Sequence, residues 1–353
     1  MKKKKILFIA SLPTKKLNFD GERNKSKDVL NALKKKDNYS ISVINYSKNK
    51  YLQSLKMCFL HTLRNFDYIF ISKCIVGGSK ALHMLRKIKK TENVYFYIIG
   101  NGYFDFNEKD ICFKDITFCK KVIVESDVVK DSMILKGVKE SNIGIFPCLK
   151  PTYNISVKEK EYQNDQPLKL LFFSRINPKK GLKDLLDVVI EINSNQKEPL
   201  FYLDIAGGVS NEPGIQEFSE EVIQTCNEYP FLNYLGMSLR INGLDSYKII
   251  QNYDLHVFPS KFNQECAPGS ILDMFVAGVP TLSSTFPSYS NLINHENSFL
   301  FEQNNKEDLK EKLLDIYHHS SETLNKRRKL SHLEYFKYTD DSFIKFLSSI
   351  QFE

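Results

Sequence analysis

The chain contains 353 residues, of which 42% are hydrophobic, 26% charged and 12% aromatic, and this composition excludes an intrinsically disordered protein. Because one compact domain usually has about 100 to 200 residues, we expect two domains. The seven cysteines are odd in number and include no C-x-x-C pair, which predicts reduced thiols in a cytoplasmic protein and argues against disulfides or a zinc site.

The formal net charge of +8 is divided unevenly along the chain. Residues 1–150 contain 30 lysines and arginines against 14 aspartates and glutamates, whereas residues 151–353 contain 20 against 28. A basic first half indicates an anionic partner, such as a phospholipid surface, a lipid diphosphate or nucleic acid. A lysine-rich coding bias is the alternative, although it would not spare the second half. Nucleic acid is not expected, because the sequence has no tryptophan and no helix-turn-helix, RNP or zinc signature.

The first 150 residues are predicted to alternate between strands and helices. The opening run MKKKKILFIASLP imitates a signal peptide, but its apolar stretch is short and meets Pro13, so we expect a buried strand. No apolar stretch approaches the roughly 20 residues of a membrane helix. Apolar periodicity predicts strands over 6–10, 40–45, 68–72, 94–99, 121–124 and 142–146.

Residues 50–65, KYLQSLKMCFLHTLRN, are predicted to form a basic amphipathic helix. Its apolar residues recur at helical spacing among cations, at Leu52, Leu55, Phe59, Leu60 and Leu63. Such a helix either lies on an anionic membrane surface or packs its apolar stripe on the sheet. The sequence leaves both interpretations open.

The second half repeats the alternation after a linker of proline and charged residues, 151–167. The α/β pattern predicts two Rossmann-like, doubly wound domains over 1–150 and 168–335, and a C-terminal helix in 336–353 that packs back toward the first domain. Ligands bind beyond the carboxyl ends of such strands, so we expect the site in a cleft between the domains. The strands of the second domain are predicted over 169–174, 201–206, 231–235, 255–259, 281–283 and 298–301.

Two cations follow the first strand of the second domain, in the segment SRINPKKG. Arg175 leaves the sheet at its carboxyl end and Lys180 starts the next helix, so both can converge on one anion. Arginine forks match phosphate oxygens, and lysine adds a point charge. Charge-assisted hydrogen bonds of roughly 1.5 to 3 kcal/mol each can, together with helix-end amides, hold a diphosphate without a metal. An ordinary basic surface loop is the alternative.

A helix is predicted from about Pro268 to Ala277, inside the segment VFPSKFNQECAPGSILDMFVAGVPTLS. Proline stands at its first position and Gly278 just past its end, as expected for a short helix. Its first N–H groups, at Gly269 and Ser270, would form an anion site.

Two carboxylates flank the start of this helix. Glu265 and Asp273 are eight residues apart, which is about two helical turns. Two acids at this spacing are usually solvated surface residues. Here the interval between them is largely apolar or small, which is unlike a solvated face.

Together these segments resemble glycosyltransferase family 4, the retaining enzymes of the GT-B fold, which include bacterial capsular and exopolysaccharide glycosyltransferases. The family's second domain carries an S/G-R-x-x-x-x-K-G loop, an L-x-I-x-G strand end, a P-S pair, two acids eight positions apart and an A-x-G-x-P turn. The resemblance is strong over residues 168–303 and weaker before them. Its counterparts here are Ser174-Arg175, Lys180-Gly181, Leu203 to Gly207, Pro259-Ser260, Glu265, Asp273 and Ala277 to Pro280.

The resemblance implies roles for the matching residues around the diphosphate and the sugar. Arg175 and Lys180 would bind and stabilise the departing diphosphate, and Glu265 would contact the donor sugar. Gly269 and Ser270 would supply amide groups to the sugar and the phosphate.

Around the nucleoside, the resemblance implies that Asp273 holds the ribose hydroxyls and that the turn at Gly236 and Met237 lies near the base. Two residues depart from the family pattern here. Asp273 is an aspartate where glutamate is usual, so its ribose contact would be shorter or bridged by water. Pro268 replaces a frequent glycine and still leaves the following amides available.

The first domain departs further, because the segment IIGNGYFD stands where family members often place a histidine near the donor sugar. Asn101 or Tyr103 is the candidate replacement, which leaves the donor sugar open. After the first strand, Gly21 is the candidate for a close approach to phosphate, and a plain turn is the alternative.

The sequence has no D-x-D motif and no His/Asp set with metal-ligand spacing, so we expect no metal ion and no cofactor. The resemblance implies same-face attack with retention and without a covalent enzyme intermediate. We therefore expect a metal-independent transferase that moves a hexose-type sugar from a nucleotide diphosphate to a glycan or undecaprenyl-diphosphate-linked acceptor. Its product would be a capsule, an exopolysaccharide or another cell-surface glycan.

The enzyme would be cytoplasmic, with an anionic membrane surface at the inner face of the plasma membrane as a partner of its first domain. A nucleotide-sugar 2-epimerase of the same fold is the alternative function. That reaction needs acid and base residues at carbon 2 of the sugar, and the few histidines near the motifs weigh against it.

Overall fold

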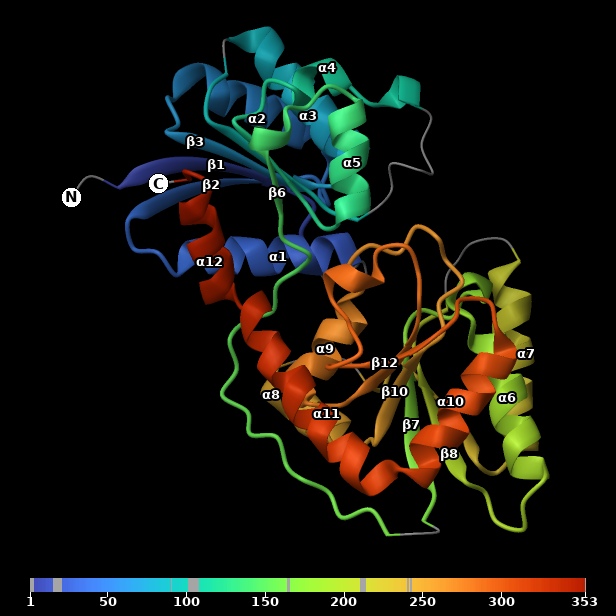
Figure 1. Ribbon diagram of the computed structural model, residues 1–353. Coiled ribbons are helices and arrows are strands. Elements are labelled where there is room, and N and C mark those ends of the chain that lie inside the picture. Colours follow the sequence, from blue (N-terminus) through green and yellow to red (C-terminus); the bar gives the residue numbers. More distant parts are fainter. Residues whose placement is uncertain are drawn as a thin grey trace. The chain divides into compact units, whose positions relative to one another are not determined.

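The computed structural model describes residues 3–14, 21–89, 91–100, 108–163, 166–209, 214–239, 241 and 243–352 (Figure 1). The chain forms two compact units. The first comprises Met1–Thr152 together with Tyr338–Glu353, and the second comprises Tyr153–Lys337. Each unit contains one six-stranded parallel sheet, which confirms the predicted α/β class.

The first sheet has the strand order β2-β1-β3-β4-β5-β6. The inner strand β1 contains the opening apolar run, whose residues Ile6 to Ala10 are fully buried, as expected for a parallel strand covered on both faces. The six strands lie where the sequence predicts them, within two residues at each end. They are β1 (Lys4–Ala10), β2 (Tyr39–Asn45), β3 (Tyr68–Lys73), β4 (Val94–Ile98), β5 (Lys121–Val124) and β6 (Ile143–Ile145).

Helices cover both faces of the first sheet (Figure 1). The last helix of the chain lies beside α1, and Phe343, Leu347 and Phe352 pack into the apolar core that α1 shares with the sheet. The other face carries α2 and α3, which pack on each other. The helices of this unit are α1 (Gly21–Lys34), α2 (Lys50–Leu63), α3 (Ile75–Ile88), α4 (Phe113–Ile116), α5 (Asp127–Leu135) and α12 (Asp340–Ser349), with 3-10 turns at Glu108–Asp110 and Glu140–Asn142.

The predicted amphipathic helix exists as α2, but its apolar stripe does not pack on the sheet. Leu52, Leu55, Phe59 and Leu63 are exposed, and Leu60 is half-buried. The interpretation that the stripe covers the sheet is therefore wrong for four of its five residues.

The second sheet has the strand order β12-β11-β10-β7-β8-β9. Its six strands also lie where the sequence predicts them. They are β7 (Leu168–Phe173), β8 (Phe201–Ala206), β9 (Leu232–Gly236), β10 (Leu255–Phe258), β11 (Thr281–Ser284) and β12 (Phe299–Phe301).

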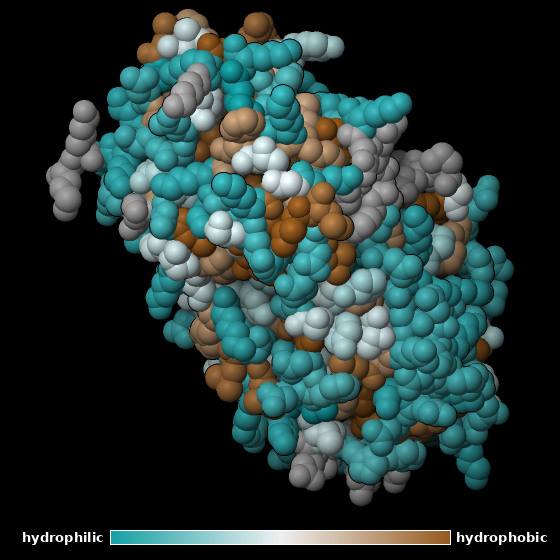
Figure 2. All heavy atoms as spheres, turned by 45° about the horizontal axis from the view of Figure 1, so that its top comes forward, coloured by the Kyte–Doolittle hydropathy of each residue, from teal (hydrophilic) through white to brown (hydrophobic). Residues whose placement is uncertain are grey.

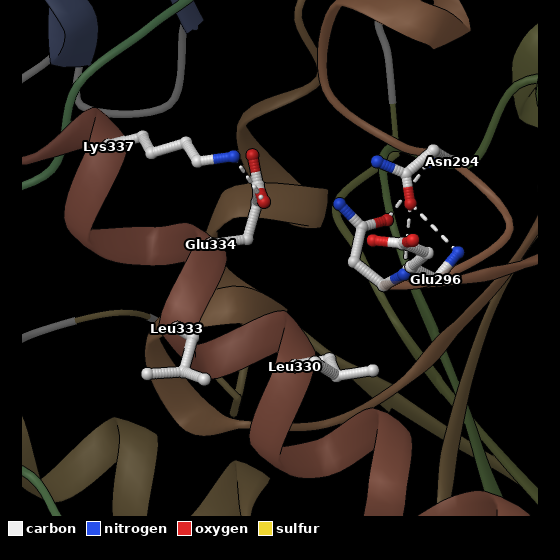
Figure 3. Close-up of a pocket in the computed structure, with 7 residues that line it drawn as sticks. Asn294, Glu296, Leu330, Leu333, Glu334 and Lys337 are labelled. Carbon is white, nitrogen blue, oxygen red and sulfur yellow. Dashed lines mark hydrogen bonds and ion pairs between the residues drawn. The ribbon is translucent and has the colours of Figure 1, made fainter.

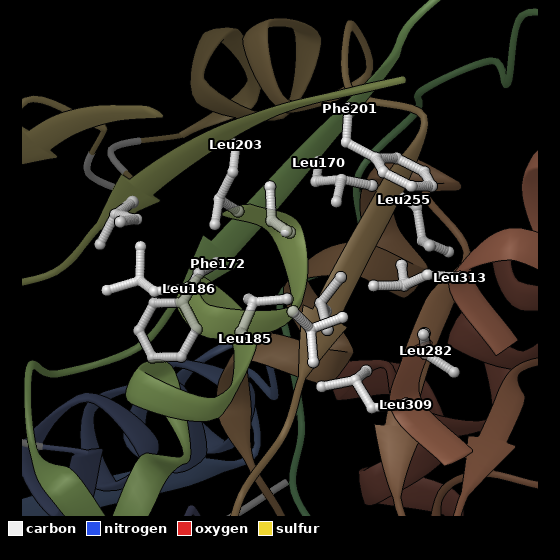
Figure 4. Close-up of a cluster of buried hydrophobic side chains, with 14 of the residues drawn as sticks. Leu170, Phe172, Leu185, Leu186, Phe201, Leu203, Leu255, Leu282, Leu309 and Leu313 are labelled. Carbon is white, nitrogen blue, oxygen red and sulfur yellow. The ribbon is translucent and has the colours of Figure 1, made fainter. Parts of the chain in front are cut away.

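The core of the second unit lies between this sheet and the helices α6, α7 and α10 (Figure 4). Leucines from β7, β8, β10 and β11 meet leucines from α6 and α10, and Leu170, Leu203 and Leu309 are almost fully buried. The opposite face carries α8, α9 and α11. The helices are α6 (Leu182–Ser194), α7 (Ile215–Glu228), α8 (Leu244–Ile250), α9 (Gly269–Ala277), α10 (Lys306–His318) and α11 (Ser320–Tyr335), with 3-10 turns at Pro178–Lys180, Tyr289–Asn291 and Phe336–Tyr338.

A topological switch point lies between β7 and β10, which are paired in parallel with His256 opposite Leu171. After β7 the chain passes to α6 on one face of the sheet, and after β10 it passes to α9 on the other. The two loops therefore diverge at the carboxyl edge of the sheet, which is where open α/β sheets bind ligands.

All seven cysteines lie in the described part of the chain and are free thiols. Among the helices of that part, none combines the length and the apolar character needed to cross a membrane.

Candidate functional site

The loop after β7 is fastened to the loop after β10 through a glycine. Gly181 has a left-handed backbone with φ of 71°, and a Cβ atom there would lie 1.8 Å from the carbonyl oxygen of Pro259. The N–H of Lys261 also donates to the carbonyl oxygen of Lys179 over 2.9 Å. Only glycine allows this backbone approach, so the sequence fixes the distance between the two loops at the switch point.

Lys180 and Glu265 form an ion pair across the two loops, and both side chains are largely buried. The Ser260 hydroxyl donates to Glu265 Oε1 over 2.9 Å. The Ser260 carbonyl in turn accepts hydrogen bonds from the Ser284 hydroxyl and the Gln303 amide. This network fixes the carboxylate, and through it the ammonium group, at the carboxyl edge of the sheet.

Arg175 extends from the same loop as Lys180, and its side chain is exposed. In the part of the chain that the structure describes, no hydrogen bond or ion pair engages its guanidinium group. Lys180 ends the 3-10 turn at Pro178–Lys180 and precedes Gly181, so it lies just before α6 and not, as its place in the sequence predicts, at the start of that helix.

The helix α9 begins at Gly269, one residue later than predicted, because Pro268 is its N-cap with an extended ψ of 119°. Gly269 and Ser270 are half-buried, and N–H groups in the first turn of a helix have no intrahelical acceptor. Gly278 ends the helix in the left-handed conformation, with φ of 65°, as its position predicted. The helix start, four residues after Glu265, is thus able to bind an anion.

Asp273 lies within α9 and is only 5% exposed, so it is not a solvated surface residue. Its Oδ1 accepts a hydrogen bond of 2.8 Å from the hydroxyl of Tyr247 on α8. That tyrosine is itself buried, and its ring packs on Tyr153. Sequence reasoning missed Tyr247, because no spacing in the sequence relates α8 to α9.

Gly236 and Met237 lie at the carboxyl edge of the same sheet. Gly236 ends β9 with φ of 56°, and its carbonyl oxygen accepts a hydrogen bond of 2.7 Å from the N–H of Gly207. Met237 is partly exposed, and its sulfur packs against Gly208. These predicted donor-site residues therefore all lie in one unit, on or next to the carboxyl edge of its sheet. They are Arg175, Lys180, Glu265, Gly269, Ser270, Asp273, Gly236 and Met237.

Gly21 belongs to the first unit, where it is the first residue of α1. Its φ is not positive, and a Cβ atom there would meet nothing within 4 Å, so no local contact requires glycine. Asn101 and Tyr103, the predicted replacements for the family's histidine, lie outside the described residues.

Buried charges at the carboxyl edge of the first sheet escaped the sequence analysis. Glu125 is fully buried, pairs with Lys25 over 2.6 Å and accepts a hydrogen bond from the N–H of Gly100. Burial raises the pKa of Glu125, and the nearby ammonium group opposes this effect. Lys73 lies 2.6 Å from the Ser11 hydroxyl and 3.5 Å from Glu22.

One group of described residues has ligand atoms close enough for a metal ion. Atoms of His83, Cys112 and Asp115 in the first unit lie within 4.8 Å of one another. The Asp115 carboxylate already accepts a hydrogen bond of 2.5 Å from Arg86, and its other oxygen lies 2.6 Å from His83 Nδ1. These residues are up to 32 positions apart, so no ligand spacing in the sequence indicates that they form a group.

A hollow of about 180 Å³ lies elsewhere in the second unit, beside α11 (Figure 3). Its polar residues bond to one another, since Lys337 pairs with Glu334 and Asn294 bonds to the backbone of Glu296. It contains none of the candidate residues, so we place the site at the switch point, where unlike charges and helix-end amides gather.

Comparisons with known proteins identify the family and the fold. The sequence model of one family, described as Glycosyl transferases group 1, matches residues 155–332. None of the curated proteins matches the sequence. Because the solved structures below share at most 16% identity with this chain, their likeness concerns the fold, and it confirms the GT-B class.

Three of these structures are similar to almost the whole chain. HepE of Anabaena, determined with UDP and glucose, has a TM-score of 0.70 and 15% identity over 98% of this chain and 100% of its own. The lipopolysaccharide outer core galactosyltransferase WaaB, in its apo form, has a TM-score of 0.69 and 16% identity over 99% of each chain. Sucrose-phosphate synthase of Thermosynechococcus elongatus has a TM-score of 0.70 and 13% identity over 99% of this chain and 98% of its own.

The segment that the family model matches covers half of the chain and contains both loops of the switch point, with Arg175, Lys180, Glu265 and α9. The matched sequence and the fold thus lead to the same assignment. The chain belongs to the glycosyl transferases group 1 family and is a glycosyltransferase.

Proposed function

We propose that this enzyme is a retaining, metal-independent glycosyltransferase that transfers a hexose-type sugar from a nucleotide diphosphate to a glycan or lipid-linked acceptor. One observation carries the donor half of the proposal. The Lys180–Glu265 ion pair lies at the switch point of the second sheet, on loops that also contain Arg175 and lead into the amino end of α9.

In this proposal the departing diphosphate is stabilised by fixed positive charge. Lys180 and Arg175 face the phosphate oxygens, and the amides of Gly269 and Ser270 add the positive end of a helix. Because the Gly181–Pro259 contact holds both loops, little reorganisation is needed when negative charge develops on the leaving group. The same charges explain why no metal ion would be required.

Glu265 would have two functions in this arrangement. Its carboxylate accepts hydrogen bonds from Lys180 and Ser260, so it orients the ammonium group toward the phosphates. It would also accept hydrogen bonds from hydroxyl groups of the donor sugar. The acceptor hydroxyl then attacks the sugar on the face from which the phosphate departs, and that phosphate helps to deprotonate the acceptor. Attack on this face gives retention of configuration.

Recognition of the nucleoside is assigned to Asp273, Gly236 and Met237. The Tyr247 hydroxyl holds the Asp273 carboxylate in place, and carboxylates of this kind bind ribose hydroxyls in dinucleotide folds. Gly236 and Met237 would lie beside the base. Uridine nucleotides are the first donors to test, because HepE, a protein of similar fold, was determined with UDP and with UDP-glucose.

For the acceptor, the basic first half of the sequence supports an anionic lipid-linked glycan at the inner face of the plasma membrane. The similarity to a lipopolysaccharide galactosyltransferase agrees with a role in cell-surface glycan synthesis, including capsule or exopolysaccharide. An undecaprenyl-diphosphate-linked glycan is the acceptor class that we propose.

The donor is tested by thermal shift with UDP-, GDP- and ADP-sugars. A ligand at 100 times its dissociation constant adds about 2.7 kcal/mol to the free energy of unfolding, so a true donor raises the melting temperature measurably. The transfer assay is run in the presence of EDTA. The proposal is supported if the nucleoside diphosphate is released and the sugar is transferred to an undecaprenyl-diphosphate glycan. Turnover that EDTA abolishes, a product of inverted anomeric configuration, or conversion of the donor to its 2-epimer would each contradict it.

A further inference from the structure

The described surface exposes large apolar side chains unevenly. The face in Figure 2 is mainly hydrophilic, and its apolar residues gather in patches. Of the thirteen large apolar side chains that are exposed in the described part of the chain, five belong to the single helix α2. They are Tyr51 (84% exposed), Leu52 (61%), Leu55 (67%), Phe59 (64%) and Leu63 (64%).

These five residues form one continuous stripe, which we call the α2 stripe. At 100° per residue they fall within an arc of about 120° on one side of the helix, and the polar Thr62 is the one other residue inside it. Lys56 borders the arc and is also exposed. A surface helix of a globular protein normally turns such a stripe toward the core.

The side of α2 that faces the protein is the more polar one. Gln53 accepts a hydrogen bond from the N–H of Asn45, and the Ser54 hydroxyl lies 3.3 Å from the hydroxyl of Tyr46. Met57 and His61 are the two buried residues of the helix, and His61 lies 3.3 Å from the Thr91 hydroxyl. These polar contacts fix the rotation of α2, so the stripe is held outward by the fold.

The lysines and arginines of α2 and of the segments that flank it in the sequence are not balanced by acidic residues there. No acidic residue occurs in the sequence between Asp37 and Asp67, whereas the four basic residues of that interval are all exposed. Lys56 borders the stripe, and the other cations lie at or just beyond the two ends of α2. An apolar helix face with cations at its border and at both helix ends is complementary to the boundary between acyl chains and anionic headgroups. The four basic residues are Lys48, Lys50, Lys56 and Arg64.

We propose that the α2 stripe is the element through which the first unit docks on an anionic lipid bilayer. Leu52, Leu55, Phe59 and Leu63 enter the headgroup boundary, and Lys56 together with the cations at the ends of the helix pairs with lipid phosphates. This inference rests on the proposed function in one respect, because a membrane-bound acceptor gives the docking its purpose. A second copy of the chain fits less well, since a two-fold contact through this stripe would bring the same cations together.

The test uses the full chain and sedimentation with vesicles of phosphatidylglycerol mixed with phosphatidylcholine, compared with phosphatidylcholine alone. We expect wild-type protein to bind the anionic vesicles and to be released as salt is added. The variant Leu55→Ser/Phe59→Ser should bind at least about tenfold more weakly, because two apolar side chains no longer leave water. The variant Lys48→Glu/Lys56→Glu should lose binding at low salt.

A matched control replaces exposed apolar residues outside α2. Leu135 (85% exposed) lies at the end of α5 in the same unit, and Ile249 (54%) lies in the second unit. Leu135→Ser/Ile249→Ser should bind vesicles as the wild type does. All variants change exposed residues, so their melting temperatures should match, and a variant that does not fold is recognised at once.

Equal vesicle binding by wild type and Leu55→Ser/Phe59→Ser would overturn the proposal. A second outcome would also overturn it. If the wild type is a dimer, and this variant is a monomer that still binds vesicles equally well, the stripe is a contact between two copies of the chain. Binding of UDP, GDP and ADP is measured in parallel on the same samples. Intact nucleotide binding without vesicle binding refutes the docking alone, whereas docking without any nucleotide binding refutes the proposed function.

Discussion

The ammonium group of Lys180 contacts the carboxylate of Glu265, although 85 positions separate the two residues in the sequence. The contact joins the loop after β7 to the loop after β10 at the switch point of the second sheet. Because both side chains are largely buried, removing one partner leaves the other as an unpaired charge in a poorly hydrated place.

The first prediction separates the stabilising and the catalytic function of this pair. Lys180→Met should lower kcat about 10² to 10³-fold, since it removes one charge that stabilises the leaving group. It should also lower the free energy of unfolding by on the order of 3 kcal/mol. The double variant Lys180→Met/Glu265→Gln should recover most of that stability in urea denaturation and none of the activity. Recovery of both would mean that Lys180 is a structural residue only.

Arg175 allows a cleaner test, because its side chain is exposed and no described residue engages it. We predict that Arg175→Ala lowers kcat by roughly 10² or more, while the free energy of unfolding stays within about 0.5 kcal/mol of the wild type. Lys179→Ala is the matched control, since Lys179 is an exposed cation of the same loop whose ammonium group lies over the ring of Phe262. Near-normal turnover by Arg175→Ala would contradict the role in leaving-group stabilisation.

Two glycines with the same backbone conformation test whether the close contact between the loops matters. Gly181 and Gly214 have φ of 71° and 78°, but a Cβ atom meets the Pro259 carbonyl oxygen only at Gly181 and nothing within 4 Å at Gly214. Gly214→Ala should cost about 1 to 2 kcal/mol through backbone strain alone. Gly181→Ala should cost more than that, measured by urea denaturation, and should also reduce kcat by separating Lys180 from Glu265. Equal losses of stability in both variants would show that the steric contact is unimportant.

Most of the strands could be predicted from the sequence because inner parallel strands, such as β1, β3 and β10, are buried on both faces and appear as short apolar runs. The limits of α9 were nearly right for a similar local reason, since Gly278 adopts the left-handed conformation that ends a helix. Motif spacing also selected Lys180 and Glu265 as candidate site residues, and the structure places them in contact at two adjacent strand ends. Their roles toward a donor stay predictions.

Contacts between distant elements could not be predicted in this way. The bond from Tyr247 to Asp273 and the buried pair of Lys25 and Glu125 join residues on separate elements, and no sequence period relates them. The orientation of α2 was also undetermined, because an apolar stripe has the same periodicity whether it faces a core or the solvent. The polar contacts of Gln53 and Ser54, which decide the orientation, depend on the neighbouring segment 45–46.

A buried histidine beneath the site makes the stability of the second unit sensitive to acid. His256 lies in β10 and is fully buried, with Nδ1 3.2 Å from the Thr281 hydroxyl and with no partner for Nε2 among the described residues. Burial lowers the pKa of His256 to about 3, whereas an unfolded chain has a histidine pKa of about 6.5. Below pH 6.5 the unfolded state therefore binds a proton that the folded state does not.

The resulting loss of stability should begin as the pH falls through 6.5 and level off below about 3, with no effect above neutrality. Between pH 7.5 and pH 5.0 this single group should lower the free energy of unfolding by about 2 kcal/mol, which follows from the two pKa values. Urea denaturation at both pH values measures the drop. In His256→Leu the drop should shrink by that amount, whereas His295→Gln, which changes an exposed histidine, should keep the wild-type pH dependence. A drop that stays the same in His256→Leu would mean that the ring takes up its proton in the folded protein as readily as in the unfolded one.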